Sequence, residues 1–274
     1  MAKIRELLLK INLFFGHLLY RKFYLNPFGN DIRASKETYI KLHEDEQHRD
    51  YPEVNEIEAE LGYCIDRDWF ETLALHTQVV IKKNPLNYQH GRLLYTFLRD
   101  YIEKNNENEI TILETGTSRG FSSLCMAKAL SDANQAGKII TIDVLPHDQQ
   151  FYWNCIDDHE RKKSRREVLE PWQDLLDRIV FVQGNTLEVV NRIAMNRVHF
   201  AFLDAQHEKN HVLREYNSIR NCQFPEDVVF FDDYTPQQFP GVVAAVDAIM
   251  EEGRHEFRKI RLSDYRGYVF ARQK

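Results

Sequence analysis

The segment Ile110 to Ser123, with the sequence ITILETGTSRGFSS, joins a short apolar run to a glycine-spaced turn and then to a helical pattern. This order is typical of a strand that ends in a tight turn at the N-terminus of a helix, where doubly wound α/β folds hold nucleotide-like ligands. Gly116 and Gly120 allow the backbone to turn sharply and to approach a ligand. The segment therefore predicts a ligand site at the end of this strand.

The residues of this turn limit the chemistry of the ligand. Glu114 places a carboxylate at the strand end, where it would repel the phosphates of a dinucleotide. Arg119 stands where a G-x-G-x-x-G turn needs its third glycine, and no G-K-[ST] sequence follows. These features favour S-adenosylmethionine, which carries a sulfonium and an ammonium group and no phosphate, over NAD or ATP.

A second apolar run, Lys138 to Asp143 (KIITID), predicts a neighbouring strand that ends in an acid. A carboxylate at this position can accept hydrogen bonds from both ribose hydroxyls of an adenosyl group. A helix cap or a solvated strand end is the alternative interpretation of Asp143.

Strands and helices alternate through the rest of the chain, which predicts a parallel, doubly wound sheet. We expect the further strands at 179–183, 199–204, 228–232, 256–262 and 267–271. The last two are joined only by Ser263 to Arg266, which is too short for a crossover helix, so the last strand should be antiparallel. The expected fold class is α/β, with a seven-stranded, mostly parallel sheet.

Three carboxylates follow two of these strands. Asp204 ends the expected fourth strand, and Asp232 and Asp233 end the fifth. Neighbouring central strands present their carboxyl ends to one crevice, so these acids should converge and need a cation among them. Hard oxygen ligands with room for water favour Mg²⁺, with Mn²⁺ or Ca²⁺ as alternatives. The other interpretation is that Asp204 binds only the methionine ammonium and the acidic pair caps a helix.

Residues 1–60 are expected to form an N-terminal helical extension and a polar connector, ahead of a single α/β domain over 61–274. The first twenty residues alternate apolar clusters with charged side chains, so they fall short of the ~20 apolar residues of a membrane-spanning helix. We expect an amphipathic helix that packs on protein, with contact to a membrane surface as the less favoured alternative. His43, His48, Asp50 and Glu53 predict a solvated loop rather than a metal cluster.

Composition sets broad limits on partners and location. A net charge of -6 gives no general field for nucleic acid, so a small-molecule substrate is expected. The four cysteines form no C-x-x-C pair, which favours a reduced, cytoplasmic protein without a zinc site.

The strings ETGTSRGFSS, FLDAQH and DDYTPQQFPGVVAAVDAIM resemble the macrocin O-methyltransferase family and, more distantly, the catechol O-methyltransferases. The resemblance covers roughly Leu86 to Lys274. It implies a class I, Rossmann-like methyltransferase that depends on S-adenosylmethionine and a metal ion. The implied acceptor is a hydroxyl of a sugar, glycan or glycosylated natural product, with a catechol-like phenol second. A homo-oligomer is compatible with it. The residues implied around the cofactor are Glu114, Gly116, Thr117, Ser118, Gly120, Ser122, Asp143, Asn185, Thr186 and Asp204; those around the metal are Asp204, Asp232 and Asp233.

One position departs from the family pattern. Macrocin-type enzymes have a second Asp two residues after the metal-binding Asp, whereas this chain has Gln206, which cannot accept a proton usefully. The catechol type has a Lys three residues after, where this chain has His207. Because imidazole has a pKa near ~6.5, His207 is the predicted general base, with a structural histidine as the alternative.

Other interpretations stay open at this stage. The stretch Leu145 to Asp177 predicts either a lid with an aromatic wall or a solvated helix with a charged face. A protein that binds S-adenosylmethionine without turnover is weakly favoured by Gln206 and disfavoured by the intact acids. An NAD-dependent oxidoreductase would share the sheet, but the glycine pattern disfavours it.

Overall fold

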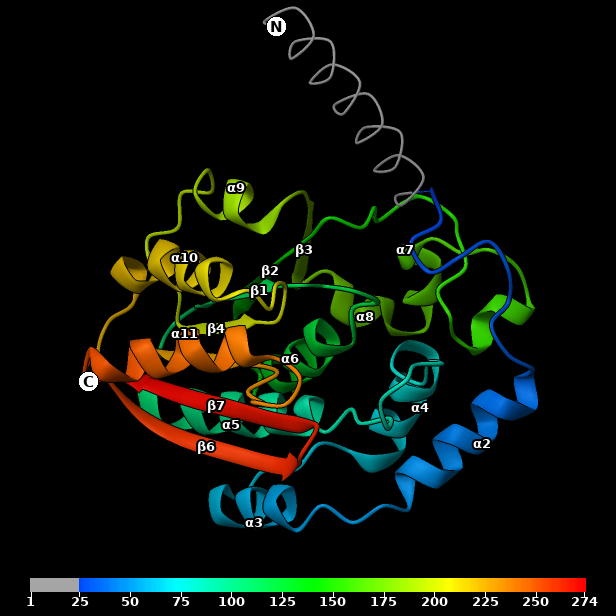
Figure 1. The fold of residues 1–274 in the computed structure, drawn as a ribbon. Helices are drawn as coiled ribbons and strands as arrows, with labels where there is room; N and C mark the ends of the chain where they lie inside the picture. Colours follow the sequence, from blue (N-terminus) through cyan, green and yellow to red (C-terminus); the bar gives the residue numbers. More distant parts are fainter. Residues whose placement is uncertain (1–24) are drawn as a thin grey trace, which may run out of the picture.

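The computed structural model describes residues 25–274, which form a seven-stranded sheet covered by helices on both faces (Figure 1). The predicted amphipathic helix over residues 1–20 lies outside the described residues. The strands are β1 (Ile110–Thr115), β2 (Gly137–Asp143), β3 (Ile179–Gln183), β4 (Phe200–Leu203), β5 (Val228–Phe231), β6 (His255–Ser263) and β7 (Arg266–Gln273).

The strand order is β3-β2-β1-β4-β5-β7-β6. The first five strands pair in parallel, and β7 runs antiparallel to both of its neighbours, β5 and β6. The predicted fold class, including the reversed last strand, is confirmed. Its consequence for function is that the carboxyl ends of β1, β2, β4 and β5 meet at one edge of the sheet.

Ten described α-helices surround this sheet. They are α2 (Lys36–Gln47), α3 (Pro52–Leu61), α4 (Arg67–Thr77), α5 (His90–Asn105), α6 (Phe121–Asp132), α7 (Arg165–Val168), α8 (Gln173–Leu176), α9 (Thr186–Val190), α10 (Lys209–Ile219) and α11 (Pro240–Glu251). Three short 3-10 helices are η1 (Ile156–His159), η2 (Glu170–Trp172) and η3 (Arg220–Cys222). Apolar residues at helical spacing over 66–82 and 86–101 predict two helices. The structure has α4, which is shorter than the first range, and α5, which begins later than the second; the segment between them contains Pro85 and is not helical.

Successive strand residues point to opposite faces of the sheet, which divides the core in two. Phe200 and Phe202 of β4 pack in the cluster that includes residues of α4, α5 and α6. Ala201 and Leu203 of the same strand pack in the cluster with α10 and α11. Because both faces are covered, β4 (FAFL) and β5 (VVFF) are apolar without interruption and β1 is mostly apolar, which is why their positions were predictable.

The polar segment 26–60 differs from the expected connector. It contains α2, which Ser35 caps by accepting a hydrogen bond from the backbone N–H of Thr38, and α3, which begins at Pro52. Tyr39, Val54 and Ile57 are fully or almost fully buried in the main core cluster. The interpretation of this segment as lying outside the core is therefore wrong, because a few apolar residues at helical spacing are enough to dock it. The domain boundary at residue 60 remains a prediction.

The stretch 145–177 forms neither of the two expected structures. Phe151 and Trp153 are fully buried, with ring centroids 4.1 Å apart, and they make a small core instead of an open aromatic wall. Arg165, from the basic run, is also buried, and its Nε donates to the backbone carbonyl of Ser118 at 2.7 Å. This stretch therefore supports the turn after β1.

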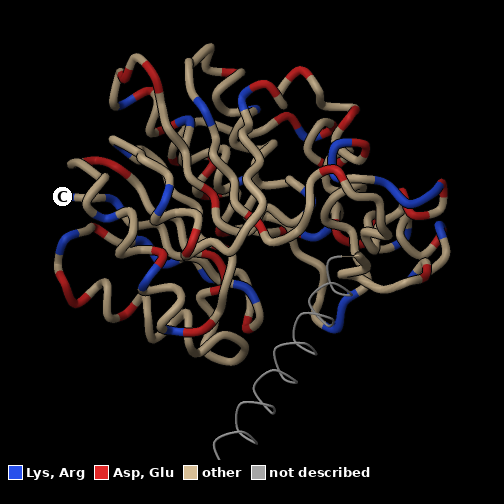
Figure 2. The backbone as a smooth tube through the Cα atoms, turned by 90° about the horizontal axis from the view of Figure 1, so that it is seen from above, with Lys and Arg blue, Asp and Glu red and all other residues tan. Residues whose placement is uncertain are grey.

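Basic and acidic residues are interspersed along the described chain (Figure 2). Among residues 25–274, none of the helices has the length and apolar character needed to cross a bilayer.

Candidate active site

A cavity of about 280 Å³ lies at the carboxyl ends of β1, β2 and β4. Its walls include the glycine turn after β1 and the residues that follow β2, β3 and β4. Six residues predicted to bind the cofactor line it, namely Gly116, Ser118, Asp143, Asn185, Thr186 and Asp204. The turn, the expected ribose-binding acid and the first acid of the expected metal site therefore come together.

Gly116 is required by the close approach of two strand ends. Its φ of +91° lies in the left-handed region, and a Cβ at this position would collide with the backbone carbonyl of Asp204. Any larger residue would push apart the ends of β1 and β4, which form two walls of the cavity.

Asp143 organises the turn from the end of β2. One carboxylate oxygen accepts the backbone N–H of Ser118 at 2.5 Å, and the other accepts that of Leu145 at 2.8 Å. The guanidinium of Arg165 lies 3.7 Å away. Each oxygen of an ionised carboxylate can accept a second hydrogen bond, so Asp143 retains capacity for ligand hydroxyls.

The other four residues predicted at the cofactor, Glu114, Thr117, Gly120 and Ser122, do not line this cavity. Strand alternation places Glu114 on the face of the sheet that α6 covers, where it accepts hydrogen bonds from Ser122, Ser123 and Thr141. Burial raises the pKa of Glu114. The carboxylate thus fixes the start of α6 from behind the turn, and its contact with a ligand stays a prediction.

Sequence reasoning missed Phe28, which lines the same cavity together with Pro27. The ring of Phe28 lies 5.9 Å from that of Trp153 and 4.5 Å from the guanidinium carbon of Arg119. Only the turn-forming sequence around Pro27 and Gly29 marked this position, and nothing in it indicated a ligand more than eighty residues away in sequence.

A second cavity, of about 500 Å³, opens beside β5 and β7. It is lined by Arg49 to Glu53, by residues of the segment 82–87, by Asp233, Gln238 and Phe239, and by residues of the β6–β7 turn. Asp233 therefore faces the second cavity, whereas Asp204 lines the first.

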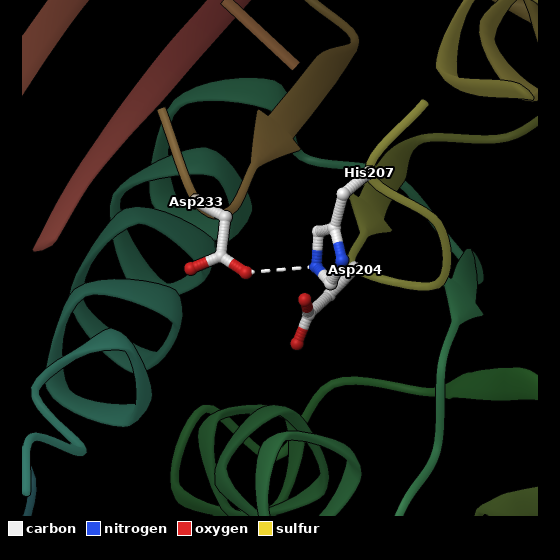
Figure 3. Close-up of side chains that lie close together, drawn as sticks. All are labelled: Asp204, His207 and Asp233. Carbon is white, nitrogen blue, oxygen red and sulfur yellow. Dashed lines mark ion pairs between the residues drawn. The ribbon is translucent and has the colours of Figure 1, made fainter. Parts of the chain in front are cut away.

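Between the two cavities lies an acidic cluster that contains an arginine the sequence analysis did not single out. Arg266, at the start of β7, bonds to Asp232 and to Asp233 at 2.8 Å each. The other oxygen of Asp233 lies 2.9 Å from Nε2 of His207. The side chains of Asp204, His207 and Asp233 point toward one another across the ends of β4 and β5 (Figure 3). Arg266 supplies a cation where the sequence predicted a metal.

The structure favours a different donor set for a metal ion from the predicted one. One ligand atom each from Asp204, His207 and Asp233 lie within 4.8 Å of one another. Asp232 is instead occupied, because it accepts the backbone N–H of Asp233 at 2.7 Å and binds Arg266. Sequence spacing could not distinguish the two neighbouring acids.

Proximity of three acids shifts their pKa values in different directions. Burial and the neighbouring acids Asp232 and Asp233 raise the pKa of Asp204 well above its usual range. Burial also raises the pKa of Asp232, to about 6, against the attraction of Arg266. For Asp233 the effect of burial is outweighed by His207 and Arg266, which lower its pKa. The cluster remains short of positive charge with Arg266 alone.

The loop that carries His207 is held by α11. A Cβ on Gly241 would collide with the backbone carbonyl of His207, so the start of this helix packs directly on the loop. The ring of Phe239 lies 4.2 Å from the imidazole. The side chain of His207 is nevertheless 44% exposed, and ligands can therefore reach it.

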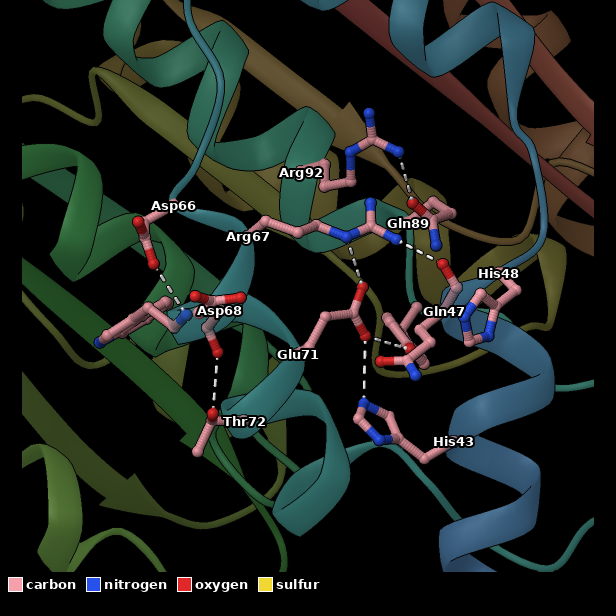
Figure 4. Close-up of polar contacts among 12 residues, drawn as sticks. His43, Gln47, His48, Asp66, Arg67, Asp68, Glu71, Thr72, Gln89 and Arg92 are labelled. Atoms are coloured by element: carbon pink, nitrogen blue, oxygen red, sulfur yellow. Dashed lines mark hydrogen bonds and ion pairs between the residues drawn. The ribbon is translucent and has the colours of Figure 1, made fainter.

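Another polar network lies around Glu71 of α4 (Figure 4). Glu71 of α4 bonds to His43 of α2 at 3.1 Å, to Arg67 at 2.9 Å and to the hydroxyl of Tyr88 at 2.5 Å. Hydrogen bonds from His43 and Tyr88 lower the pKa of Glu71 although burial alone would raise it. His43 thus belongs to a structural network that joins α2, α4 and the segment before α5, and its predicted place in a solvated loop is wrong.

Comparison with known proteins agrees with this architecture. Residues 113–234 match the family model described as a methyltransferase domain. The chain is similar to the O-methyltransferase TomG from Streptomyces achromogenes in complex with SAM, at 17% identity and a TM-score of 0.53 over 77% of this chain and 92% of that one. It is also similar to an O-methyltransferase from Bacillus cereus in complex with SAH, at 16% identity and a TM-score of 0.52 over 88% and 100%. A search of curated protein sequences gave no match.

The sheet order with its reversed β7 and the turn after β1 define the class I methyltransferase fold. Residues 113–234 match a methyltransferase domain, and the described chain has the class I methyltransferase fold. The predicted resemblance to class I O-methyltransferases is confirmed at the level of the fold.

Replacing Arg266 should show how strongly the acidic cluster depends on it. In Arg266→Met, two buried carboxylates lose their counter-ion, and we expect the free energy of unfolding to fall by about 3–5 kcal/mol. Adding Asp232→Asn to this variant should restore part of the lost free energy. Urea unfolding at pH 7 measures the stability of both variants. Arg261→Met is the control, because it breaks an exposed ion pair with Asp264 in the same hairpin. A loss no larger than the control's would show that the bridge is dispensable.

Proposed function

We propose that this protein transfers the methyl group of S-adenosylmethionine to a hydroxyl oxygen of a small-molecule acceptor, with sugar hydroxyls as the preferred class. The observation that carries the proposal is the position of the acidic cluster between two cavities. Asp204 lines the smaller cavity and Asp233 lines the larger one. A methyl donor in the first and an acceptor in the second would meet at these side chains.

Support for the donor cavity comes from its polar groups. The turn at Gly116 lets a ligand approach the backbone closely, and the carboxylate of Asp143 can accept hydrogen bonds from ribose hydroxyls. Asp204 supplies a carboxylate where the positively charged sulfonium and ammonium groups would be favoured. TomG and the Bacillus cereus enzyme, both O-methyltransferases, have the same fold and were solved with SAM and SAH, respectively.

His207 is our proposed general base. Its Nε2 lies 2.9 Å from a carboxylate oxygen of Asp233, and this contact fixes the orientation of the ring. An acceptor hydroxyl in the larger cavity would lie beside this pair and could transfer its proton to the imidazole. Gln206 lines the smaller cavity, so its lack of basicity does not leave the acceptor side without a base.

A divalent cation such as Mg²⁺ fits the cluster. Three carboxyl groups face one guanidinium, and the raised pKa values of Asp204 and Asp232 indicate that a further positive charge would be favoured there. Asp204 and Asp233 supply hard oxygen donors for such a cation. Arg266 binds both Asp232 and Asp233, but only Asp233 has a ligand atom close to those of Asp204 and His207, so we propose Asp204 and Asp233 as the carboxylate ligands. Bound there, the ion would lower the pKa of the acceptor hydroxyl.

The walls of the larger cavity contain both aromatic and polar side chains, which supports a sugar-containing acceptor over a purely apolar one. The larger cavity combines the aromatic residues Tyr51, Phe239 and Tyr265 with the amides of Asn84, Asn87 and Gln238. A catechol-like phenol is the alternative, and transfer of label from S-adenosylmethionine to a panel of sugars and phenols distinguishes them. Label on neither class would favour a protein that binds the cofactor without turnover.

Phe28 should contribute to cofactor binding. Phe28→Ala removes an aromatic wall of the smaller cavity, and we expect the Kd for S-adenosylhomocysteine to rise about tenfold, which corresponds to about 1.4 kcal/mol. Calorimetric titration measures it. Phe224→Ala, at an exposed aromatic outside the cavity, is the control and should bind as the wild type does. An unchanged Kd in Phe28→Ala would place the cofactor elsewhere.

Removal of divalent ions should stop methyl transfer. With EDTA we expect turnover to fall to background and Mg²⁺ to restore it, while S-adenosylhomocysteine still binds. Asp233→Asn should lose activity that Mg²⁺ cannot restore, whereas Asp148→Asn, at an exposed ion pair, should not. Full activity in chelator would exclude the metal and leave Arg266 and His207 as the groups that act on the acceptor.

His207→Ala should lower kcat by about 10²-fold or more, the usual contribution of a general base, without raising the Kd for S-adenosylhomocysteine. Single-turnover rates with saturating Mg²⁺ make the measurement. His48→Ala, at an exposed histidine, controls for loss of imidazole. A wild-type rate in His207→Ala would assign His207 a structural role.

A further inference from the structure

We propose that the larger cavity takes an acceptor that carries an anionic oxygen group, such as a phosphate or a carboxylate, and that Lys82 binds this group. This inference rests on the proposed function, since it names the class of acceptor for the same cavity. It concerns the part of the chain that precedes the matched methyltransferase domain at residues 113–234.

The cavity is built largely from segments distant in sequence from the cofactor turn. Arg49 to Glu53, which connect α2 to α3 and form the first residues of α3, make one wall, and the segment with Lys82 and Leu86 forms another. The β6–β7 turn completes the lining, with Asp233 and Arg266 on the side of the acidic cluster. Any molecule that places a hydroxyl at Asp233 therefore contacts these segments.

Lys82 differs from the other two cations of the cavity because its charge is not matched. Arg49 pairs with Glu46 at 3.1 Å, and Arg266 pairs with Asp232 and Asp233. Within residues 25–274, Lys82 makes neither a hydrogen bond nor an ion pair. Its ammonium group therefore has donors available for a ligand.

The acids that face the cavity do not neutralise Lys82. Asp233 is engaged by Arg266 and His207, and Asp50 accepts a hydrogen bond from Asn55 at 2.9 Å. Glu53 is exposed to solvent at the first turn of α3. These positions leave the ammonium group without a close counter-ion.

Lys82 lines the cavity while its side chain stays exposed to solvent, so a ligand can reach the ammonium group. Loss of hydration in the cavity, followed by the nearby Arg266, lowers the pKa of Lys82 to about 8, although Asp233, Asp232 and Glu46 oppose this shift. An anionic group would remove that penalty, because a charge-assisted hydrogen bond is stronger than a neutral one. Lys82 is thus suited to select acceptors by charge, while the aromatic side chains contact the uncharged body of the molecule.

The affinity for matched sugars tests this inference. It is measured by calorimetric titration of each sugar into protein saturated with S-adenosylhomocysteine. The probes are glucose, glucose 6-phosphate and glucuronate, which share a ring and differ in charge. We expect the two anionic probes to bind at least tenfold more tightly than glucose. Lys82→Met should abolish this difference, and Lys82→Arg should retain it. Lys83→Met, at the neighbouring lysine outside the cavity lining, is the control and should behave as the wild type does.

Three results would overturn the inference: equal affinity for neutral and anionic probes, a preference for anions that survives Lys82→Met, or no binding of any probe. Its failure is distinguishable from that of the proposed function. If S-adenosylhomocysteine does not bind, the methyltransferase proposal itself fails. If it binds while charge has no effect on the sugars, only the assignment of Lys82 fails.

Discussion

The ion pairs of Arg266 with Asp232 and Asp233 are the interaction on which the site depends. They join the start of β7 to the end of β5, and they offset the repulsion of acids that the sheet topology forces together. The reversed β7 places Arg266 at this edge, because β7 pairs Val269 with Phe231, the last residue of β5, and its first residues extend beside the segment that follows β5. The same strand order that defines the fold thus supplies the counter-ion of its acidic cluster.

The two cavities of the site are lined by different parts of the chain. Residues that follow β1, β2 and β4 surround the smaller cavity, and this is the region that matches the methyltransferase domain. The larger cavity takes its outer walls from the segments 49–53 and 82–87. The network around Glu71 joins α2 to α4 and to the segment before α5, next to these walls in the chain. If the larger cavity holds the acceptor, as we propose, these N-terminal segments contribute to acceptor choice together with the β6–β7 turn.

The sheet could be predicted from sequence because strands buried on both faces are short apolar runs ended by polar residues, as in Ile110–Thr115 and Val228–Phe231. Asp143 and Asp204 were predictable for the same reason, since strand ends converge. The direction in which a side chain points was not predictable. Glu114 also lies near a strand end, yet the alternation of side chains along the strand turns it toward α6. Phe28, Lys82 and Arg266 reach the site through tertiary packing, which no local motif encodes.

A crystal structure with bound S-adenosylhomocysteine tests most directly the claim that the acidic cluster joins the donor to the acceptor. We expect the ribose at Asp143, the backbone of the turn at Gly116 against the ligand, and the sulfur directed past Asp204 toward the cavity that Asp233 lines. A ligand bound outside the smaller cavity, or one whose sulfur points away from the larger cavity, would contradict this arrangement.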